Sequence, residues 1–429
     1  MKIIDLRKGV FERRLKGLSR EVSYSYPRIE SYVRKIVEAV RKDGDKALFR
    51  YTKKFDKVEL TPKTVKVSNK EIETAEALVS EEVKSNLALA AERIKDFHER
   101  KPPQEHTFTD SLGNELGWII RPLEKVGVYV PGGKAAYPST VLMTVIPAKV
   151  AGVKEVFLVT PCPNGQINPT VLVAAYMAGV SAVYKVGGAQ AIAALAFGTE
   201  SIPKVDKIVG PGNIYVSIAK KLVFGNVDID MIAGPSEVLV ISDGSVPAEW
   251  VASDLLAQAE HDEMAVAVLV TNSLEFAKQV KQEVIKRLKK LERRQIAQVA
   301  IRNQGRIFVV NTLDDAISVS NAIAPEHLEL CVEDPKAILP KVKHAGAIFL
   351  GSLSTEAFGD YIAGPSHVLP TSGSARFSSP LSVYEFLRMP SIISVSQSGF
   401  KELGDSVMNL AYSEGLEAHA LSVKVRLDR

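Results

Sequence analysis

Several residues of the sequence belong to the types that bind metal ions. Gln258 and His261 lie three residues apart at the end of an apolar stretch, so on a helix both can face the same side. Asp360 lies in a Phe-Gly-Asp-Tyr segment, and His419 lies five residues after Glu414 near the C-terminus. Two histidines and a carboxylate are good zinc ligands when they converge, although glutamine is an uncommon one. The spacing alone does not show convergence, and each residue taken singly is more often a polar helix end, a turn residue or a solvated helix residue.

Glu326 and His327 form a second candidate group, because two neighbouring acid–base side chains can transfer protons to and from a substrate. They follow Pro325 just before a predicted strand. In an extended strand the two side chains would point to opposite faces of the sheet, whereas in a turn both could reach one substrate. On the pattern alone we favour a loop glutamate beside a histidine at the strand edge.

Three glycine-containing turns indicate where a ligand could bind. They are Pro131-Gly132-Gly133, Gly187-Gly188 and Gly210-Pro211-Gly212, and each follows a predicted strand. Glycine lets the backbone approach a ligand closely, and the helix N-terminus that follows favours an anion such as a pyrophosphate. None of the turns matches GxGxxG, and singly each is an ordinary strand-to-helix turn. Together they favour a ligand cleft at the carboxyl edge of a parallel sheet without identifying the ligand.

The elements that would position these residues alternate between short β-rich runs and helical stretches, which predicts an α/β fold with parallel sheets. The alternation restarts after Ala233-Gly234-Pro235, so we expect two tandem Rossmann-like units. The first has predicted strands at 126–130, 155–160, 182–186 and 207–209, with helices at 140–151, 169–178 and 189–197. The second has predicted strands at 237–242, 265–271, 306–310, 328–332 and 347–350.

Four segments follow from this pattern. Residues 1–110 read as a helical N-terminal segment, expected to pack on the second unit, with Gly44 ending one helix and Ser68 and Glu71 forming a capping box before another. The first α/β unit spans 111–235 and the second 236–375. Residues 371–379, rich in Ser and Gly, look like a linker. A C-terminal arm, 376–429, is too short for a core of its own and must pack on something else.

The composition excludes several classes of protein. Lys plus Arg number 54 and Asp plus Glu 50, so the net charge of +4 is nearly balanced over 429 residues. The densest positive stretch, 286–294, reads as the solvated face of a helix, and we expect no nucleic-acid partner. Two cysteines, Cys162 and Cys331, make no disulfide framework. The sequence has no signal peptide and no apolar run long enough to span a bilayer, so we expect no membrane association and a cytoplasmic location.

Seven blocks of the sequence, in the same order as in the family, resemble the histidinol dehydrogenases. The resemblance runs from about residue 20 to the C-terminus, with no departure at a functional position. The blocks are VGVYVPGGKAAYPSTVLMTVIPAKVAGV, VGGAQAIAALAFGTESIPKVDKIVGPGN, DMIAGPSEVLV, DLLAQAEHD, APEHLEL, FGDYIAGPSHVLPT and EGLEAHA.

The resemblance implies a reaction: the NAD-linked oxidation of L-histidinol to L-histidine through L-histidinal, the last step of histidine biosynthesis. By this resemblance His327 takes the alcohol proton as hydride leaves for NAD, and it assists the second oxidation. Glu326 activates the water that adds to the aldehyde.

The same resemblance implies a set of ligand contacts. One zinc ion per active site is expected to hold the imidazole and amine of the substrate. Its implied ligands are Gln258, His261, Asp360 and His419. Further implied substrate contacts are Ser236, His327 and Glu414, together with the four zinc ligands. The implied NAD contacts are Tyr129, Gln190 and Asn213. The family is homodimeric, and the arm would supply Glu414 and His419 to the active site of the neighbouring subunit.

Two other functions stay open. A metal-free α/β enzyme could bind a phosphorylated sugar at the glycine turns, with no role for Gln258, His261 and His419. A non-catalytic two-lobed binding protein would usually carry an export signal, which is absent. A cysteine could also hold the aldehyde as a thiohemiacetal. If a strand begins at His327, Cys331 shares its face by period two, but we expect Cys331 to be buried and inert.

Overall fold

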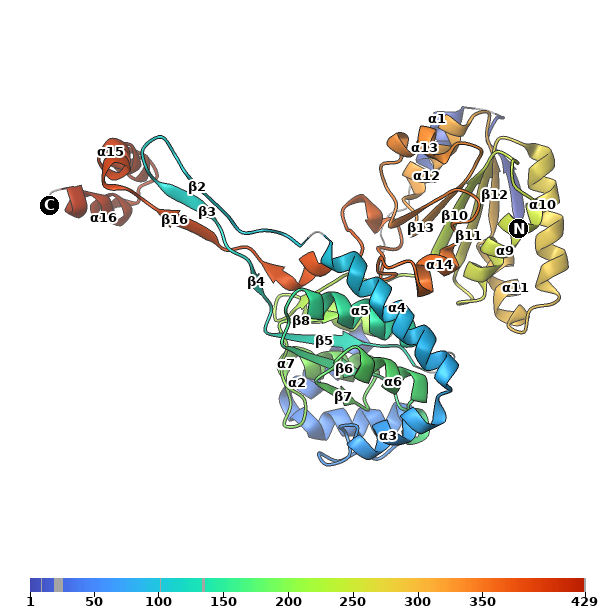
Figure 1. Ribbon diagram of the computed structural model, residues 1–429, viewed down its shortest axis with the longest axis horizontal. Helices are drawn as coiled ribbons and strands as arrows, with labels where there is room; N and C mark the ends of the chain where they lie inside the picture. The colour runs from blue at the N-terminus through green and yellow to red at the C-terminus, as the bar shows by residue number, and fades with distance from the viewer. Residues whose placement is uncertain (9, 19–25, 101, 133–135, 428–429) are drawn as a thin grey trace.

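The computed structural model describes residues 1–8, 10–18, 26–100, 102–132 and 136–427. Within these residues, two parallel β-sheets form the centres of two α/β units, and an antiparallel arm projects from the first unit (Figure 1). The predicted fold class is therefore confirmed. None of the described helices combines the length and apolarity needed to cross a bilayer.

The first unit is built on a five-stranded parallel sheet in the order β7-β6-β5-β8-β9. The strand order reverses between β5 and β8, and open sheets bind ligands beyond the carboxyl ends of their strands at such a reversal. Its strands are β5 (Lys125–Tyr129), β6 (Glu155–Val159), β7 (Ala182–Tyr184), β8 (Lys207–Val209) and β9 (Asp228–Ile229), and its helices are α5 (Pro138–Val150), α6 (Pro169–Met177), α7 (Gly188–Phe197) and α8 (Ile214–Val223).

The second unit repeats this topology and adds one strand from the start of the chain. Its parallel sheet has the order β1-β12-β11-β10-β13-β14. The strands are β1 (Lys2–Asp5), β10 (Glu237–Ser242), β11 (Val266–Thr271), β12 (Arg306–Val309), β13 (His327–Cys331) and β14 (Ala347–Leu350). The helices are α1 (Phe11–Lys16), α9 (Ala248–Ala259), α10 (Leu274–Leu288), α11 (Arg294–Asn303), α12 (Leu313–Ile323), α13 (Pro335–Ile338) and α14 (Glu356–Tyr361).

The nine strands predicted for the two sheets are all present, each within two residues of its predicted bounds. The capping box is also present: Ser68 Oγ accepts from the Glu71 amide at 3.3 Å, and the Glu71 carboxylate accepts from the Ser68 amide at 2.8 Å. Gly44 breaks the helix where expected, with φ of 52°, although the chain resumes a helical course directly beyond it.

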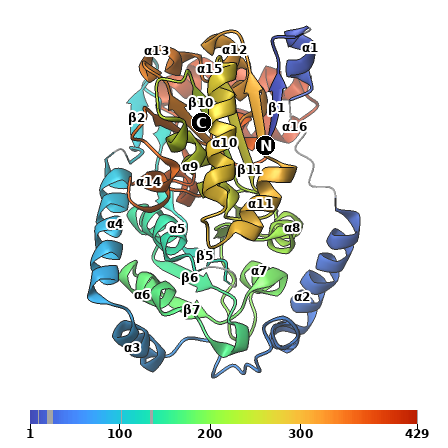
Figure 2. The ribbon, with the colours of Figure 1, turned by 90° about the vertical axis from the view of Figure 1, so that its right-hand side faces the viewer.

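The expected packing of residues 1–110 on the second unit is wrong for most of the segment. Helices α2 (Pro27–Asp56), α3 (Asn69–Leu78) and α4 (Glu81–Glu99) cover the first unit, against α5, α6, α7 and α8 (Figure 2). The apolar stripe of α2 around Val33 and Val40 is buried in one core with the alanine-rich helix α7, whose small side chains allow close packing. Of the elements described in this segment, β1 and α1 are part of the second unit, and β1 was not expected as a strand.

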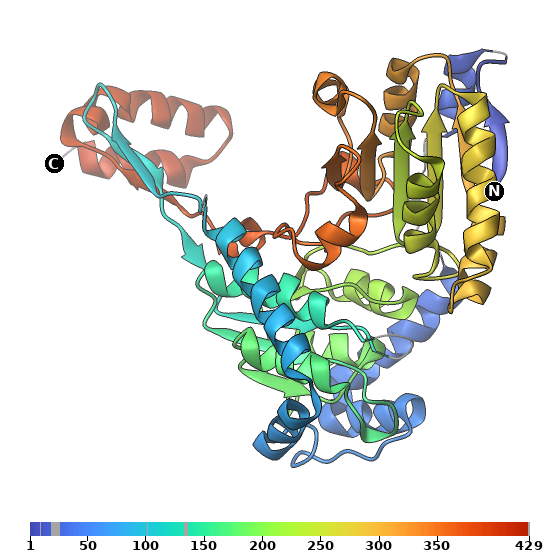
Figure 3. The ribbon, with the colours of Figure 1, turned by 45° about the vertical axis from the view of Figure 1, so that its right-hand side comes forward.

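The arm consists of residues 106–122 together with 387–427. Strands β2 (His106–Thr109), β3 (Glu115–Trp118) and β16 (Ser391–Ser394) form an antiparallel sheet, and β4 (Arg121–Pro122) pairs with β15 (Leu387–Arg388). Helices α15 (Gln397–Ser413) and α16 (Glu417–Leu427) pack on each other at its far end (Figure 3). The predicted boundary at 110 therefore cuts through this structure, and the predicted arm lacks residues 106–122, because strands far apart in sequence pair within it.

Two of the chain segments that pass between the units, near Ala233 and Thr371, lie against each other. The amide of Gly234 donates to Thr371 Oγ1 at 2.6 Å, and Ser217 Oγ on α8 donates to the carbonyl of Ala233 at 2.8 Å. Thr371 and Ser374 are buried. Residues 371–379 were expected to be a linker, but the first part of this stretch is packed into the junction between the units.

A buried ion pair holds the turn that follows β8. Lys220 Nζ contacts Asp230 Oδ1 and donates to the Gly210 carbonyl at 3.0 Å, while the Gly210 amide donates to Asp230 Oδ2 at 2.7 Å. Gly210 has a φ of +107°, and a Cβ at this position would lie 2.1 Å from the carbonyl oxygen of Tyr129. The ion pair thus satisfies both backbone groups of a glycine that no other residue type can replace.

Lys220→Met is expected to lower the free energy of unfolding by about 3–5 kcal/mol, because it leaves the carboxylate of Asp230 buried without its counter-charge. Urea unfolding followed by circular dichroism measures the loss. Lys221→Met is the matched control: its partner Glu30 lies 3.4 Å away at the surface, so the expected loss is below about 1 kcal/mol. Equal losses in the two variants would contradict the role given to Lys220.

Candidate active site

The candidate residues of the second unit gather at the amino ends of its strands. His327 is the first residue of β13, and Ser236 immediately precedes β10. Gln258 lies in the last turn of α9 and His261 just beyond that turn, before β11 begins. Asp360 lies on α14, on the side of this unit that faces the first (Figures 1 and 3). The candidate site residues of the second unit are therefore positioned by the amino edge of its sheet.

His327 is poised as a base. Its side chain is buried, and Nδ1 donates to the carbonyl of Glu237 at 3.0 Å, which leaves Nε2 as the acceptor of the neutral ring. Nε2 has no hydrogen-bond partner among the described residues and lies 3.8 Å from Asp360 Oδ1. Burial lowers the pKa of His327 to about 4. The ring is therefore neutral at neutral pH and stops acting as a base only as the pH falls through about 4.

The side chain of Glu326 also contacts the backbone of Glu237. Its Oε2 accepts from the Glu237 amide at 2.8 Å and lies 3.8 Å from His327 Nδ1. Glu326 precedes the strand instead of continuing it, so the two side chains lie together, as a turn allows. Burial raises the pKa of Glu326 well above its usual range, and the negative charges of Glu237 and Asp360 add to that shift. A carboxyl group with a raised pKa is a suitable proton carrier near neutral pH.

Buried polar atoms without partners occur on two helices of this unit, α9 and α14. Gln258 is fully buried, and neither atom of its amide has a hydrogen-bond partner among the described residues. Both carboxylate oxygens of Glu356 are likewise buried and unpartnered there. Atoms of His327, Glu356 and Asp360 lie within 4.8 Å of one another. Buried polar atoms without partners are costly, so this arrangement fits a bound ion or polar ligand.

Two further implied zinc ligands are His261 and Gln258. His261 lies close enough to His327 to affect its pKa, and Gln258 is near His261 in the sequence. The positive form of His261 lies near enough to lower the pKa of both His327 and His367. Gln258 is three residues from His261 in the sequence, and Asp360 Oδ1 lies 3.8 Å from His327 Nε2. The donor set of amide oxygen, imidazole nitrogen and carboxylate oxygen suits zinc.

The structure does not bring the last two candidates into this site within one chain. Glu414 ends α15 and His419 lies on α16, and both are exposed. In Figures 1 and 3 these helices lie at the far end of the arm, away from α9 and α14.

The three candidate cofactor residues lie at the carboxyl edge of the first sheet. Tyr129 ends β5, and its hydroxyl accepts from the Gly188 amide at 3.1 Å. Gln190 is in the first turn of α7, with its Oε1 buried and unpartnered among the described residues. Asn213 caps α8 by accepting from the amides of Tyr215 and Val216. They adjoin the predicted glycine turns, of which Gly133 lies outside the described residues.

Sequence reasoning missed His367, which connects the two units at the site. Its Nδ1 donates to the Asp360 carbonyl at 2.9 Å, and its Nε2 lies 3.2 Å from Thr140 Oγ1 at the start of α5. Glu356 was also missed, although its position four residues before Asp360 places both on one face of α14. In both cases the available signal was a titratable residue within seven positions of Asp360, a candidate already chosen.

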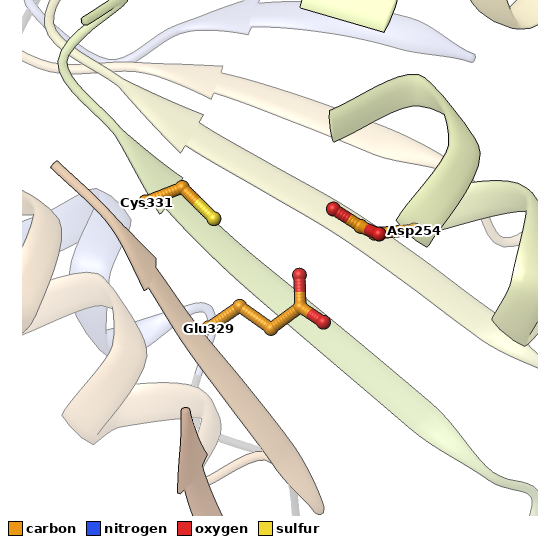
Figure 4. Close-up of side chains that lie close together, drawn as sticks. All are labelled: Asp254, Glu329 and Cys331. Carbon is orange, nitrogen blue, oxygen red and sulfur yellow. The ribbon is translucent and has the colours of Figure 1, made fainter. Parts of the chain in front are cut away.

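Cys331 does lie on the face of β13 that His327 and Glu329 share. Figure 4 shows its thiol beside the carboxyl groups of Asp254 and Glu329. Burial and these carboxylates raise the pKa of Cys331, so it remains a protonated thiol. A protonated thiol is a poor nucleophile.

Comparison with known proteins finds matches that cover nearly the whole chain. A family model described as "Histidinol dehydrogenase" matches residues 19–427. A histidinol dehydrogenase of Syntrophotalea carbinolica is 56% identical over 93% of each chain, and one of Aquifex aeolicus is 55% identical over 99% of each. The crystal structure of a histidinol dehydrogenase from Elizabethkingia anophelis is 39% identical, with a TM-score of 0.94 over 100% of this chain and 98% of that one. The chain belongs to the histidinol dehydrogenase family.

Proposed function

We propose that the chain oxidises L-histidinol to L-histidine in two NAD-linked steps through L-histidinal, with one zinc ion in each active site. The observation that carries the proposal is the pairing of Glu326 and His327 on the backbone of Glu237, in the unit that also carries the buried amide of Gln258, which has no hydrogen-bond partner among the described residues. A neutral imidazole and a carboxyl with raised pKa suit the two proton transfers that an alcohol and then an aldehyde hydrate require.

Two proton carriers divide the work. His327 Nε2 removes the hydroxyl proton as the carbon–hydrogen bond of the alcohol breaks. Glu326 takes a proton from the water that adds to the aldehyde, and His327 acts again as the hydrate is oxidised. When bound, zinc supplies a fixed positive charge that orients the substrate, and NAD supplies the hydride acceptor in each step. Asp360, 3.8 Å from Nε2, stabilises the positive charge that His327 gains on accepting a proton.

The zinc site would be completed by a second copy of the chain. Gln258, His261 and Asp360 come from one subunit, and His419 and the substrate contact Glu414 come from the arm of the other. The arm carries exposed apolar side chains, including Ile393 at 73% and Leu410 at 66%, which fit a covered position in a homodimer.

The direct test of the function is NADH formation from L-histidinol and NAD by the purified full-length chain. We expect activity that a chelator abolishes and added zinc restores. A chain that turns over histidinol unchanged after complete zinc removal would contradict the metal-dependent mechanism. A chain that binds a phosphorylated sugar but not histidinol would support the metal-free alternative.

His261→Asn and His419→Asn should each lose zinc and activity together, because each removes one ligand of the proposed ion. Zinc content and turnover are measured on the same preparations, with His344→Asn as the control at a histidine to which no role in the zinc site is assigned. Full zinc content with unchanged turnover in either ligand variant would contradict the assignment. Co-expression of the two variants tests the shared site: hybrid dimers regain one intact site if His419 acts across the dimer, and none if it acts within one chain.

Glu326→Gln should slow the aldehyde step by about 10²- to 10⁴-fold and leave the first hydride transfer largely intact, because water enters only at the second stage. His327→Asn should slow both steps, since the hydroxyl proton must leave at the start. Single-turnover NADH formation, started once from histidinol and once from histidinal, separates the two. Equal slowing of both steps by Glu326→Gln would contradict the division of work.

Cys331→Ala should keep most of its aldehyde oxidation, because the buried thiol stays protonated and His327 and Glu326 already supply the proton transfers. The measurement is NADH formation from histidinal, on a variant whose zinc content matches that of the unaltered chain. Near-complete loss of this half-reaction would instead favour a thiohemiacetal on Cys331.

A further inference from the structure

Glu329 lies at a position in the second sheet where a charged residue is unusual. It is the third residue of β13 and is fully buried. Its two neighbours in the strand, Leu328 and Leu330, are buried in the apolar core on the opposite face. A carboxyl group buried this deeply destabilises a fold unless its oxygens find partners, so its contacts indicate what it does.

One oxygen of Glu329 holds the start of α14. Glu329 Oε1 accepts from the amide of Glu356, the first residue of that helix, at 2.8 Å. The residue in the capping position, Thr355, makes no side-chain hydrogen bond to the helix. Glu329 therefore satisfies an amide that the local sequence leaves open, and the helix it fixes carries Asp360 one turn later.

The other oxygen of Glu329 faces α9. The carboxyl groups of Glu329 and Asp254 lie within 4.8 Å of each other and point toward each other in Figure 4. Burial raises the pKa of Glu329 well above its usual range and that of Asp254 to about 6. Two buried carboxyl groups this close do not readily both ionise, so they can share one proton in a hydrogen bond. Asp254 lies one turn before Gln258 on α9, and His261 follows just beyond the end of that helix.

We propose that Glu329 is a positioning residue that joins α9 to α14 and so fixes the spacing of Gln258, His261 and Asp360. The inference rests on the proposed zinc site. Groups that hold metal ligands in place from behind commonly change metal affinity by about 10- to 100-fold when they are removed. The sheet suits this task, because a strand between two helices is the most rigid element that touches both.

The test measures zinc binding directly, by competition between the full-length chain and a chromophoric chelator. Glu329→Leu fills the space but can neither accept from Glu356 nor donate to Asp254, so its zinc dissociation constant should rise about 10- to 100-fold. Glu329→Gln keeps one acceptor and one donor, so its zinc affinity should stay close to that of the unaltered chain. If Glu329 only filled space, Glu329→Leu and Glu329→Gln would bind zinc equally well. A higher zinc affinity in Glu329→Gln than in Glu329→Leu therefore indicates that the hydrogen bonds matter.

Leu330→Val is the matched control for lost stability. It lies next to Glu329 in β13 and points to the opposite face, so it should lower the thermal midpoint without changing zinc affinity. If Glu329→Leu does not fold, Asp254→Ala at the half-buried end of the same contact should show the loss of zinc affinity.

Unchanged zinc affinity in a folded Glu329→Leu or Asp254→Ala variant would overturn the inference and leave the zinc site intact. Zinc affinity that falls with stability in Leu330→Val would also overturn it. An unaltered chain that binds no zinc would instead overturn the proposed zinc site, and the inference with it.

Discussion

The register between β10 and β13 determines the geometry of the site. Val238 pairs with His327, which sets the backbone of Glu237 beside both Glu326 and His327. One backbone unit then satisfies both side chains, its amide bound to the carboxylate and its carbonyl to the imidazole. A slip of one residue would turn His327 to the other face of the sheet. Leu328 and Leu330 of β13 and Leu239 and Ile241 of β10 are buried in one apolar core, which opposes such a slip.

The two units meet through opposite edges of their sheets. The first contributes the carboxyl ends of β5 and β8, where helices α7 and α8 begin, and the second contributes the amino ends of β10 and β13. The first edge therefore presents helix N-termini, which favour a phosphate-bearing ligand, and the second presents acid–base side chains. Thr140 and His367 join these edges directly. The two units share one topology but present different surfaces to each other, because the first presents the carboxyl edge of its sheet and the second presents the amino edge.

The sequence predicted the strands well because buried parallel strands are short apolar runs between turn residues, as at 237–242. It did not predict which unit the N-terminal helices cover, since an apolar stripe such as that of α2 indicates burial but not its partner. Strand β1 was missed because four residues at a chain start carry too little pattern. The roles of Gln258 and His419 came from the family resemblance alone. Glu329 was visible only as a carboxylate inside an apolar strand, and its two contacts depend on helices distant in sequence.

The place of β1 in the second sheet has a consequence for how the chain is made. Lys2 pairs with Arg306, so β1 leaves the ribosome about three hundred residues before its neighbour in the sheet. The whole sheet of the first unit, from β5 to β9, is synthesised in between. Domains tend to fold as they emerge, and the first unit can form its sheet while β1 still lacks a partner. β1 can join the edge of the second sheet only after β12 has been synthesised, so it stays without its partner strand while the first unit is made.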